Sequence, residues 1–544
     1  MSEEARRERW WMLGAWISVA LCLFVGLLPI LAPGVPSEDD PNAISVDRAM
    51  EHVEFIAQEP HVMGTLEIER VRDYLVTTLT EMGLEPETMT IETPDYFGSS
   101  GGTVEVVDVL ARIPGAGDGE AVLLMAHYDT VPTTSGANDN AVAVAALLEA
   151  ARELSAGPPP PNDVIILLTD GEEPTPRYGA WGFAEFHPWF ADVALAVNFE
   201  GIGVAGPSML VELSGPSGEL IYRLAKAVAD PVAFSFMTQT ADIIGGAATD
   251  FDVFRDRDVP GYNFAYMRGS SIYHTPRDAI DAVNVKGLAH HGSLALDIAR
   301  NLDLEESVYS DWDDAIFFTV PGGLVIQYSS VGAAVGVLTA LLLVGYALWL
   351  RVSRPGSSVR ALLGGTGLVI AAALGIVVAA SVVWFGLVNL RGDMGPTEGY
   401  IYLTGLVGLA GAGWYQARRW SAARGSDLVG GVLIVWLVLA VTVGLFVQAI
   451  GYLFVWPAMA IGAAELLAAR RRGYVARLVS VVIVAVTTFV VLVPAVDTFF
   501  HFASPRPGNP GSEMPAMIAL PVLFAFLAIG LIASRTSEPT AEAT

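Results

Sequence analysis

The sequence predicts an α/β domain with a mostly parallel central sheet, joined to an all-α domain that crosses a membrane several times. In the first part of the chain, apolar runs of strand length alternate with helical patterns. The last part consists mainly of apolar runs long enough to span a bilayer. Charge divides the chain at the same place, because residues 33–320 hold 47 acidic and 14 basic residues and residues 321–544 hold 8 and 13. We therefore expect an anchor at 1–32, an α/β domain at 33–320 and a membrane domain at 321–544.

Strand-like and helix-like patterns alternate along the α/β domain. Strands are expected at 104–110, 122–126, 164–169, 193–199, 208–213 and 261–266. Helices are expected at 46–58, 64–83 and 139–154, where apolar residues recur at helical spacing. Because strands that alternate with helices usually form parallel sheets covered by helices, this order predicts an α/β sandwich.

Eight apolar runs have about the 20 residues that a membrane-spanning helix needs. They cover 10–32, 325–350, 361–388, 399–417, 428–448, 451–469, 475–497 and 516–534. Arginine clusters precede the first run and follow the second, fourth and sixth, so they occupy alternate loops. Since basic residues concentrate on the cytoplasmic side, we expect both termini in the cytoplasm and residues 33–320 outside it, at the cell membrane. The first run lacks a clean A-x-A site, which favours a retained anchor over a cleaved signal peptide.

Side chains of the types that bind divalent metals stand in short blocks, most of them directly after an expected strand, where open α/β sheets build their sites. They are His127 and Asp129 in AHYDT, Asp139 in SGANDNA, Glu172 and Glu173 in LLTDGEE, Glu200 in VNFEG, and Tyr273 and His274 in SIYHTPRD.

Each of these residues has an ordinary structural interpretation when taken singly, and only the set points to metal chemistry. Two adjacent carboxylates at a strand end are costly unless a cation compensates them. Since adjacent side chains point apart, one of Glu172 and Glu173 can bind a metal while the other faces a water molecule. A histidine ligand needs a partner on its second ring nitrogen, which Asp129 can supply to His127. Asp139 is expected to open a helix.

The blocks AHYDT, GANDNA, DGEE, VNFEG, ATDFDVF and YHTPRD resemble, in order and spacing, those of the M28 family of zinc metallopeptidases. The resemblance covers about residues 45–302 and is greatest to the membrane-bound branch of the family. Members of that branch also have an N-terminal span, a lumenal peptidase domain and a C-terminal region of several spans. The resemblance implies a zinc-exopeptidase-like sandwich. Glu200 departs from many soluble members, which have aspartate there.

The resemblance also implies two co-catalytic zinc ions and a role for each candidate residue. The implied ligands are His127 and Glu200 for one ion, Glu173 and His274 for the other, and Asp139 for both. The implied catalytic residues are Glu172 as general base, Asp129 as the residue that orients His127, and Tyr273 as a hydrogen-bond donor to the tetrahedral oxyanion.

We therefore expect a membrane-anchored, zinc-dependent exopeptidase that acts on peptides, and among exopeptidases an aminopeptidase. A glutaminyl cyclase, a carboxypeptidase or dipeptidase, and an inactive binding ectodomain remain alternatives. The complete ligand set disfavours the inactive ectodomain and the cyclase, which needs one zinc. The acidic surface argues against nucleic-acid binding. Few charges lie in the seven C-terminal spans, which favours a scaffold or a homo-oligomer contact in the bilayer over transport.

Overall fold

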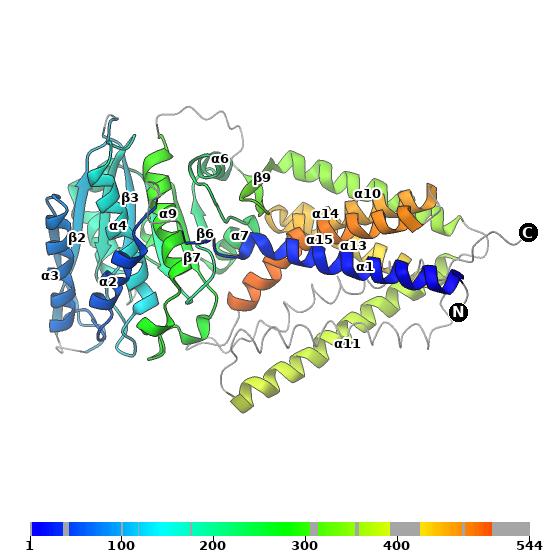
Figure 1. The fold of residues 1–544 in the computed structure, drawn as a ribbon, viewed down its shortest axis with the longest axis horizontal. Helices are drawn as coiled ribbons and strands as arrows, with labels where there is room; N and C mark the ends of the chain where they lie inside the picture. The colour runs from blue at the N-terminus through cyan, green and yellow to red at the C-terminus, as the bar shows by residue number, and fades with distance from the viewer. Residues whose placement is uncertain are drawn as a thin grey trace, which may run out of the picture.

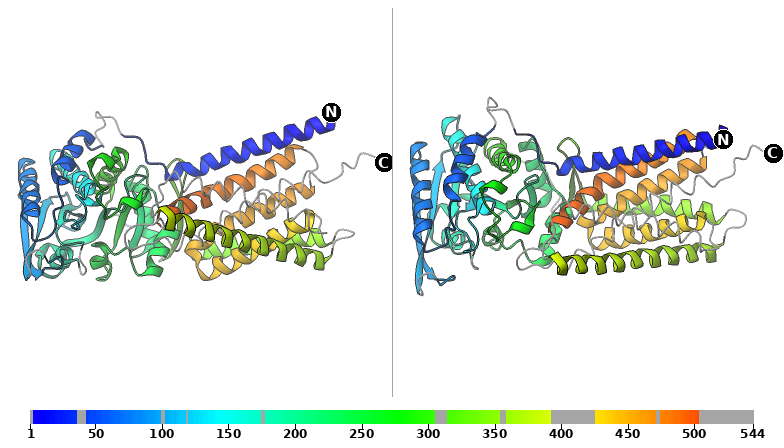
Figure 2. Two further views of the ribbon diagram at one scale, coloured as in Figure 1. Left: turned by 90° about the horizontal axis from the view of Figure 1, so that it is seen from below. Right: turned by 60° about the horizontal axis from the view of Figure 1, so that its bottom comes forward.

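The computed structural model describes residues 3–35, 43–98, 102–117, 119–173, 177–304, 314–353, 358–391, 425–470 and 474–502. Two bodies make up these residues, an α/β domain and a bundle of long apolar helices (Figure 1). The bundle extends from one side of the α/β domain, and the start of the first helix lies at its far end (Figure 2). The expected combination of an α/β domain with an all-α membrane region is confirmed.

A seven-stranded mixed sheet forms the centre of the α/β domain. Its order is β1 (Glu87–Pro94), β2 (Thr103–Ile113), β4 (Asp163–Thr169), β3 (Ala121–His127), β5 (Val193–Gly201), β7 (Gly261–Tyr266) and β6 (Met209–Ser214). The four central strands, from β4 to β7, are parallel, while β1, β2 and β6 pair antiparallel with their neighbours. The central strands are almost wholly buried, which explains their continuous apolar runs.

All six expected strands are present, whereas β1 was missed. β1 is an edge strand whose residues are mostly exposed, and only Met89 and Ile91 interrupt its threonines and glutamates. Its sequence therefore carries little of the apolar alternation that identifies a half-buried strand.

Helices cover both faces of the sheet, and apolar packing joins them to it. On one face lie α2 (Val46–Ile56), α3 (Leu66–Glu81), α4 (Val142–Ala156), α6 (Ser217–Ala227) and α9 (Val285–Asn301). On the other lie α5 (Tyr178–Phe186) and α8 (Phe251–Arg255). The side chains of Ser45, Thr65 and Asn284 cap the N-termini of α2, α3 and α9 by accepting backbone N–H bonds, so these helices begin where polar side chains replace missing carbonyl partners.

Five described helices are long and apolar enough to cross a membrane: Ser330–Val352, Val359–Ala379, Asp427–Phe446, Gln448–Leu467 and Leu478–His501. They belong to α10 (Ser330–Val352), α11 (Val359–Arg391), α13 (Gly425–Phe446), α14 (Gln448–Arg470) and α15 (Tyr474–Phe502). The expected runs 399–417 and 516–534 lie outside the described residues. The first expected run falls in α1 (Glu3–Leu27) and η1 (Leu28–Ile30), and α1 packs along α15.

A β-hairpin links the two bodies. It consists of β8 (Ala315–Val320) and β9 (Leu324–Ser329), and α10 follows it directly. The expected domain boundary at 320 falls in the turn of this hairpin. The expected span at 325–350 begins later, at Ser330, because residues 324–329 pair as a strand.

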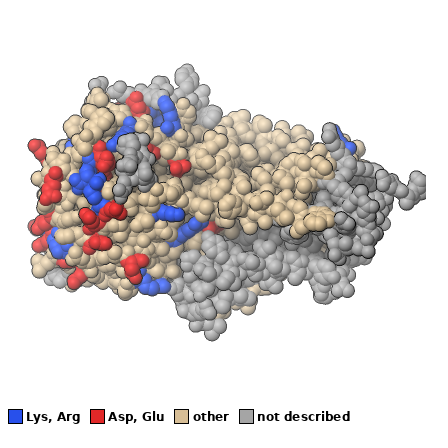
Figure 3. All heavy atoms as spheres, viewed as in Figure 1, with Lys and Arg blue, Asp and Glu red and all other residues tan. Residues whose placement is uncertain are grey.

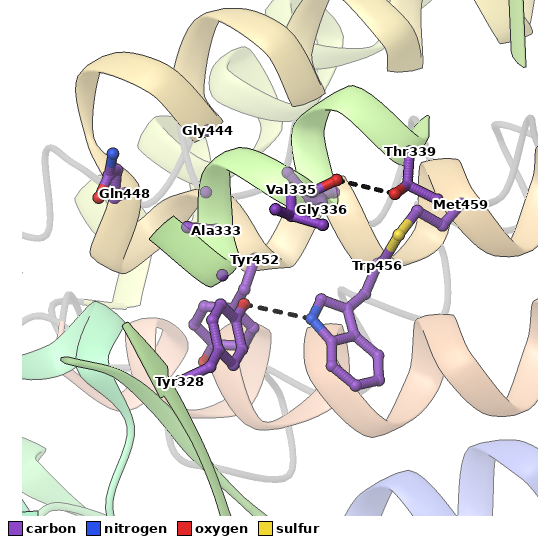
Figure 4. Close-up of a pocket in the computed structure, with 13 residues that line it drawn as sticks. Tyr328, Ala333, Val335, Gly336, Thr339, Gly444, Gln448, Tyr452, Trp456 and Met459 are labelled. Atoms are coloured by element: carbon purple, nitrogen blue, oxygen red, sulfur yellow. Dashed lines mark hydrogen bonds between the residues drawn. The ribbon is translucent and has the colours of Figure 1, made fainter. Parts of the chain in front are cut away.

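Small residues allow the spanning helices to approach closely. A Cβ atom on Gly444 of α13 would lie 2.7 Å from a methyl carbon of Val337 in α10. Towards the α/β domain, the helices part around a cavity of about 270 Å³, where Tyr328, Gln448 and Trp456 form part of the lining (Figure 4). Trp456 Nε1 donates to the Tyr328 hydroxyl, 3.2 Å away. Tyrosine and tryptophan favour the membrane–water interface, so we infer that the interface runs near this level.

Charge follows the same division in three dimensions. On the face shown in Figure 3, acidic and basic side chains gather on the α/β domain, whereas the described surface of the helices is almost uncharged. An ion pair joins Arg351, in the last turn of α10, to Glu465 of α14, so it lies at the end of α10 that is farther from β9 and the α/β domain. The charge distribution thus fits an aqueous domain on a membrane-embedded bundle.

Candidate metal centre

Three neighbouring parallel strands carry candidate ligands at their carboxyl ends. His127 is the last residue of β3, Glu172 and Glu173 follow β4, and Glu200 is the next-to-last residue of β5. The order β4–β3–β5 brings these ends together. Loops supply the remaining two residues, Asp139 before α4 and His274 after β7. The blocks, which are separate along the chain, therefore form a single cluster at one edge of the sheet.

The cluster contains two groups of three residues that share one carboxylate. His127, Asp139 and Glu200 form one group, and Asp139, Glu173 and His274 form the other. In the first group, His127 Nε2 lies 3.3 Å from Asp139 Oδ1 and 3.4 Å from Glu200 Oε2. In the second, His274 Nε2 lies 3.2 Å from Asp139 Oδ2 and 3.1 Å from Glu173 Oε2. Asp139 thus turns one oxygen towards each group.

These distances between ligand atoms suit a cation with tetrahedral coordination. Two ligands at about 2.1 Å from a tetrahedral zinc ion lie about 3.4 Å apart, close to the distances above. Asp139 Oδ2, Glu173 Oε1 and His274 Nε2 are buried and make no hydrogen bond within the described part of the structure. Since buried polar atoms without partners are rare, a bound cation would explain all three. The imidazole and carboxylate donors fit zinc.

Burial opposes ionisation of the glutamates in the absence of a cation. It raises the pKa of Glu172 well above its ordinary value. Burial, together with the negative charge of Asp139, raises the pKa of Glu173 to about 7. Burial lowers the pKa of His274, but the adjacent carboxylates of Asp139 and Glu173 outweigh it and raise this pKa to about 10. Divalent cations would compensate the same carboxylates directly, which supports the fit.

Asp129 connects the ends of β3 and β4. Its backbone carbonyl lies 3.1 Å from His127 Nδ1, and its carboxylate Oδ1 lies 3.5 Å from the same nitrogen. The carboxylate also accepts the backbone N–H groups of Glu172 and Glu173, at 3.1 and 3.3 Å. Asp129 therefore lies beside His127 and also holds the backbone of both glutamates, which the sequence did not suggest.

Asp139 does not open a helix, contrary to expectation. Its φ and ψ angles of −119° and 80° are non-helical, and α4 begins only at Val142. The preceding loop lies close to β5, because a Cβ atom on Gly201 would come within 1.9 Å of the Asn138 carbonyl oxygen. The spacing of apolar residues in the sequence predicted a helix from Asp139 onward. This contact and the hydrogen bonds of the loop instead hold Asp139 in an extended conformation.

Asp278 holds the Asp139 loop and was missed by the sequence reasoning. Its Oδ1 accepts the backbone and side-chain N–H groups of Asn138, each at 2.8 Å, and its Oδ2 accepts the backbone N–H of Asp139 at 3.2 Å. Asp278 is 1% exposed. Its position as the last residue of the YHTPRD block was the available signal.

Two asparagines hold Glu200, and they were also missed. Asn198 Nδ2 donates to Glu200 Oε1 at 2.9 Å. Asn140 Nδ2 donates to the Phe199 carbonyl at 2.7 Å and lies 3.4 Å from Glu200 Oε2. Both asparagines stand inside the GANDNA and VNFEG blocks, so the blocks include residues that orient a ligand as well as the ligands.

Tyr273 lies against the His274 ring. The two rings stack with centroids 3.8 Å apart and planes 17° apart. Burial, followed by the negative charge of Asp139, raises the pKa of Tyr273 well above its ordinary value, so its phenol stays protonated and able to donate a hydrogen bond. Thr133 Oγ1 donates to the His274 carbonyl at 2.9 Å. The stacking and this bond fix the direction of the His274 ring.

The α/β domain is similar in sequence to known peptidases. Residues 108–299 match the model of peptidase family M28. The chain is 28% identical over 250 residues to mouse endoplasmic reticulum metallopeptidase 1, covering 44% of this chain and 28% of that protein. It is 26% identical over 299 residues to the vacuolar membrane protease of Eremothecium gossypii, covering 51% and 29%. The chain therefore spans about a third of the length of these curated relatives.

Solved structures with a similar α/β domain include enzymes of more than one activity. An aminopeptidase from Aneurinibacillus sp. matches with a TM-score of 0.40 and 14% identity, covering 49% of this chain and 98% of that one. A glutaminyl cyclase from Porphyromonas gingivalis matches with a TM-score of 0.38 and 20% identity, covering 48% and 99%. A zinc-dependent exopeptidase from Parabacteroides distasonis matches with a TM-score of 0.38 and 18% identity, covering 49% and 100%.

Proposed function

Residues 108–299 form a domain of peptidase family M28, and on this premise we propose that the chain is a membrane-anchored aminopeptidase with two zinc ions. The coarser part, a zinc-dependent metallopeptidase in a membrane, follows from the family and from the apolar helices. The finer part, removal of N-terminal residues from peptides, is the proposal. The single observation that most supports a two-zinc enzyme is the position of Asp139. Each of its two carboxylate oxygens faces a separate group of candidate ligands.

Five side chains would hold the metals. His127 and Glu200 would bind one zinc ion, Glu173 and His274 the other, and Asp139 both. When bound, such a pair polarises the scissile carbonyl and lowers the pKa of an attacking water.

Glu172 is the proposed general base. It lies beside the ligands, since one of its oxygens is within 4.8 Å of donor atoms of His127 and Glu173. The two groups that share Asp139 do not include Glu172, which leaves its carboxylate to accept a proton from the attacking water. The same carboxyl group then returns that proton to the leaving amine.

Two further functions belong to residues around the metals. The Tyr273 hydroxyl would donate a hydrogen bond to the oxygen that becomes negative as the tetrahedral state forms. The excess of carboxylates at the site would attract the positively charged amino terminus of a peptide. The proposal therefore expects action on free amino termini, since a blocked terminus would lose the attraction.

The full chain, purified in detergent, tests the proposal with a set of amino-acid p-nitroanilides and short peptides. We expect release of N-terminal residues, loss of activity with a chelator, recovery with zinc, and two zinc equivalents per chain by elemental analysis. N-acetylated versions of the same peptides should not be cleaved. Cyclisation of N-terminal glutamine with one zinc equivalent would replace the proposal with a glutaminyl cyclase, and cleavage only from the carboxyl end with a carboxypeptidase. No turnover of any substrate would support an inactive binding domain.

We further infer that the α/β domain lies outside the cytoplasm, with both termini inside, in the cell membrane. The arginine clusters at alternate loops support this orientation. The Arg351–Glu465 pair also lies at the end of the bundle that this topology assigns to the cytoplasm.

A further inference from the structure

The segment between β7 and His274 lies against the end of a membrane helix. Two guanidinium nitrogens of Arg268, Nε and Nη2, donate to Asp497 Oδ2 of α15 at 3.1 and 2.9 Å. Two residues further on, Ser270 Oγ donates to the His501 carbonyl of the same helix at 2.8 Å. The chain reaches Tyr273 and His274 only three and four residues after this second contact.

The same segment is bonded to the loop that leaves Glu200. Arg268 N–H donates to the Ala205 carbonyl at 3.0 Å, and the N–H groups of Val204 and Ala205 donate to the Arg268 carbonyl at 2.8 and 3.1 Å. Gly203 permits this approach, because a Cβ atom there would lie 2.5 Å from the Arg268 carbonyl oxygen. Arg268 therefore joins α15 both to the segment that leads to His274 and to the loop that follows β5, the strand that carries Glu200.

Asp497 is an unusual residue for its position. It is the only acidic residue in α15, it is buried, and it lies within the membrane-spanning stretch Leu478–His501. A carboxylate in such a helix is costly and usually has a functional partner. Arg268, which is itself only partly exposed, supplies that partner from the α/β domain.

Apolar packing around this contact makes the helix a rigid support. Phe236 of α7 (Ser235–Ile244) packs on Phe499 with ring centroids 5.1 Å apart. Phe318 of β8 stacks on Tyr452 of α14 with centroids 4.7 Å apart. These residues belong to one buried cluster that runs from the α/β domain into the bundle. Large apolar interfaces suppress relative motion of domains, so a contact made by α15 is transmitted to the loop.

We propose that Asp497 is a positioning residue for the metal centre, acting through Arg268 on the 268–274 segment. The inference rests on the proposed function only in treating His274 as a metal ligand. The bundle then has a role beyond anchoring, because the helix end sets where His274 and Tyr273 stand. Residues that orient a ligand from outside the metal's own contacts typically change metal affinity about 10- to 100-fold when altered.

The full chain in lipid nanodiscs tests this with Asp497→Asn, which keeps the shape and removes the charge. Zinc bound at graded free zinc should show one equivalent weakened about tenfold and the other unchanged, with kcat reduced more than KM. Hydrogen exchange, followed by mass spectrometry, should become faster in the 268–274 segment. Asp497→Glu should restore most of the affinity, and Ser270→Ala should give a smaller change in the same direction.

Glu465→Gln is the matched control, because it removes the acid of another arginine pair in the bundle, at the end of α10 that is farther from the α/β domain. It should leave zinc affinity and exchange of the 268–274 segment unchanged. Equal zinc binding and equal exchange in Asp497→Asn and wild type would overturn the positioning role, as would the same loss in Asp497→Asn and Glu465→Gln. If the wild type binds no zinc, the proposed function fails, while the exchange comparison still decides whether Asp497 orders the segment.

Discussion

The backbone N–H of Asp139 donates to Oδ2 of Asp278, 3.2 Å away. The residue that faces both groups of candidate ligands is thus held by an acid four residues beyond His274. One short segment, 273–278, thus contains a candidate ligand, the proposed hydrogen-bond donor Tyr273 and the residue that supports the Asp139 loop.

Asp278→Asn should weaken the metal centre. Its amide nitrogen cannot accept the Asp139 N–H, so the loop that carries the shared carboxylate loses one support. We expect zinc affinity and kcat/KM to fall roughly 10- to 100-fold, as for other residues that orient ligands. Equilibrium dialysis against zinc and steady-state kinetics measure the effect. Asp281→Asn, at an exposed acid nearby, is the control, and equal behaviour of the two variants would contradict the role of Asp278.

Glu172→Gln should separate proton transfer from metal binding. The amide cannot accept a proton, and we expect kcat to fall by a factor of about 10² to 10⁴. Zinc content should stay at the wild-type level, because Glu172 belongs to neither three-residue group that Asp139 shares. Glu105→Gln, on the exposed side of β2, should keep full activity. Loss of zinc in Glu172→Gln would show that Glu172 acts as a ligand.

Ligand substitutions should divide the centre into two halves. His127→Ala should release one zinc equivalent and His274→Ala the other, because each histidine belongs to only one of the two groups that share Asp139. Asp139→Asn should weaken both, since it replaces one of the two oxygens that the groups share. Elemental analysis after gel filtration gives the equivalents per chain. Loss of all metal in every variant would point to a single, indivisible site.

Glu149 should make the free energy of unfolding depend on pH in the acid range. Burial raises the pKa of Glu149, but hydrogen bonds from His52, Arg48 and Arg152 outweigh it and lower this pKa to about 2. Because the folded pKa lies below the unfolded value, the stabilisation is present above about pH 4.5 and is lost as the pH falls towards 2. We expect Glu149→Gln to cost about 2 kcal/mol at neutral pH.

Thermal unfolding of wild type and Glu149→Gln in detergent, from pH 7 to pH 3, checks this. The difference in Tm should stay constant from pH 7 to about pH 4.5 and shrink as the pH is lowered further. A difference that is constant with pH would mean that Glu149 acts by packing and not by charge.

Cysteine labelling should report the orientation in the membrane. Cys22 is the only cysteine, so a Cys22→Ser chain provides a clean background. In intact cells, a membrane-impermeant maleimide should label Glu105→Cys in the α/β domain and spare Ser353→Cys, between α10 and α11. Labelling of only Ser353→Cys would reverse the topology.

Patterns among residues that are close together in the sequence predicted most of the central sheet and of the candidate site. The buried strands have continuous apolar runs, and the ligands follow them directly, so order along the chain translates into position at one sheet edge. The sequence did not predict edge strand β1, because most of its residues are polar and exposed. The sequence also did not predict the non-helical conformation of Asp139, because contacts with β5 and Asp278 impose it.

The sequence by itself predicted six of the seven strands of the central sheet, three of the helices around it, the acidic α/β and apolar helical parts, and the candidate ligands, because periodicity, charge and residue type are local properties. Only the tertiary structure decided that Asp139 is held in a non-helical conformation, that Asn140, Asn198 and Asp278 hold candidate ligands or their loops, and that Arg268 meets Asp497. The last pair is 229 residues apart in the chain. Contacts of that kind arise when separate elements pack together, and no pattern along the chain records which distant side chains then meet.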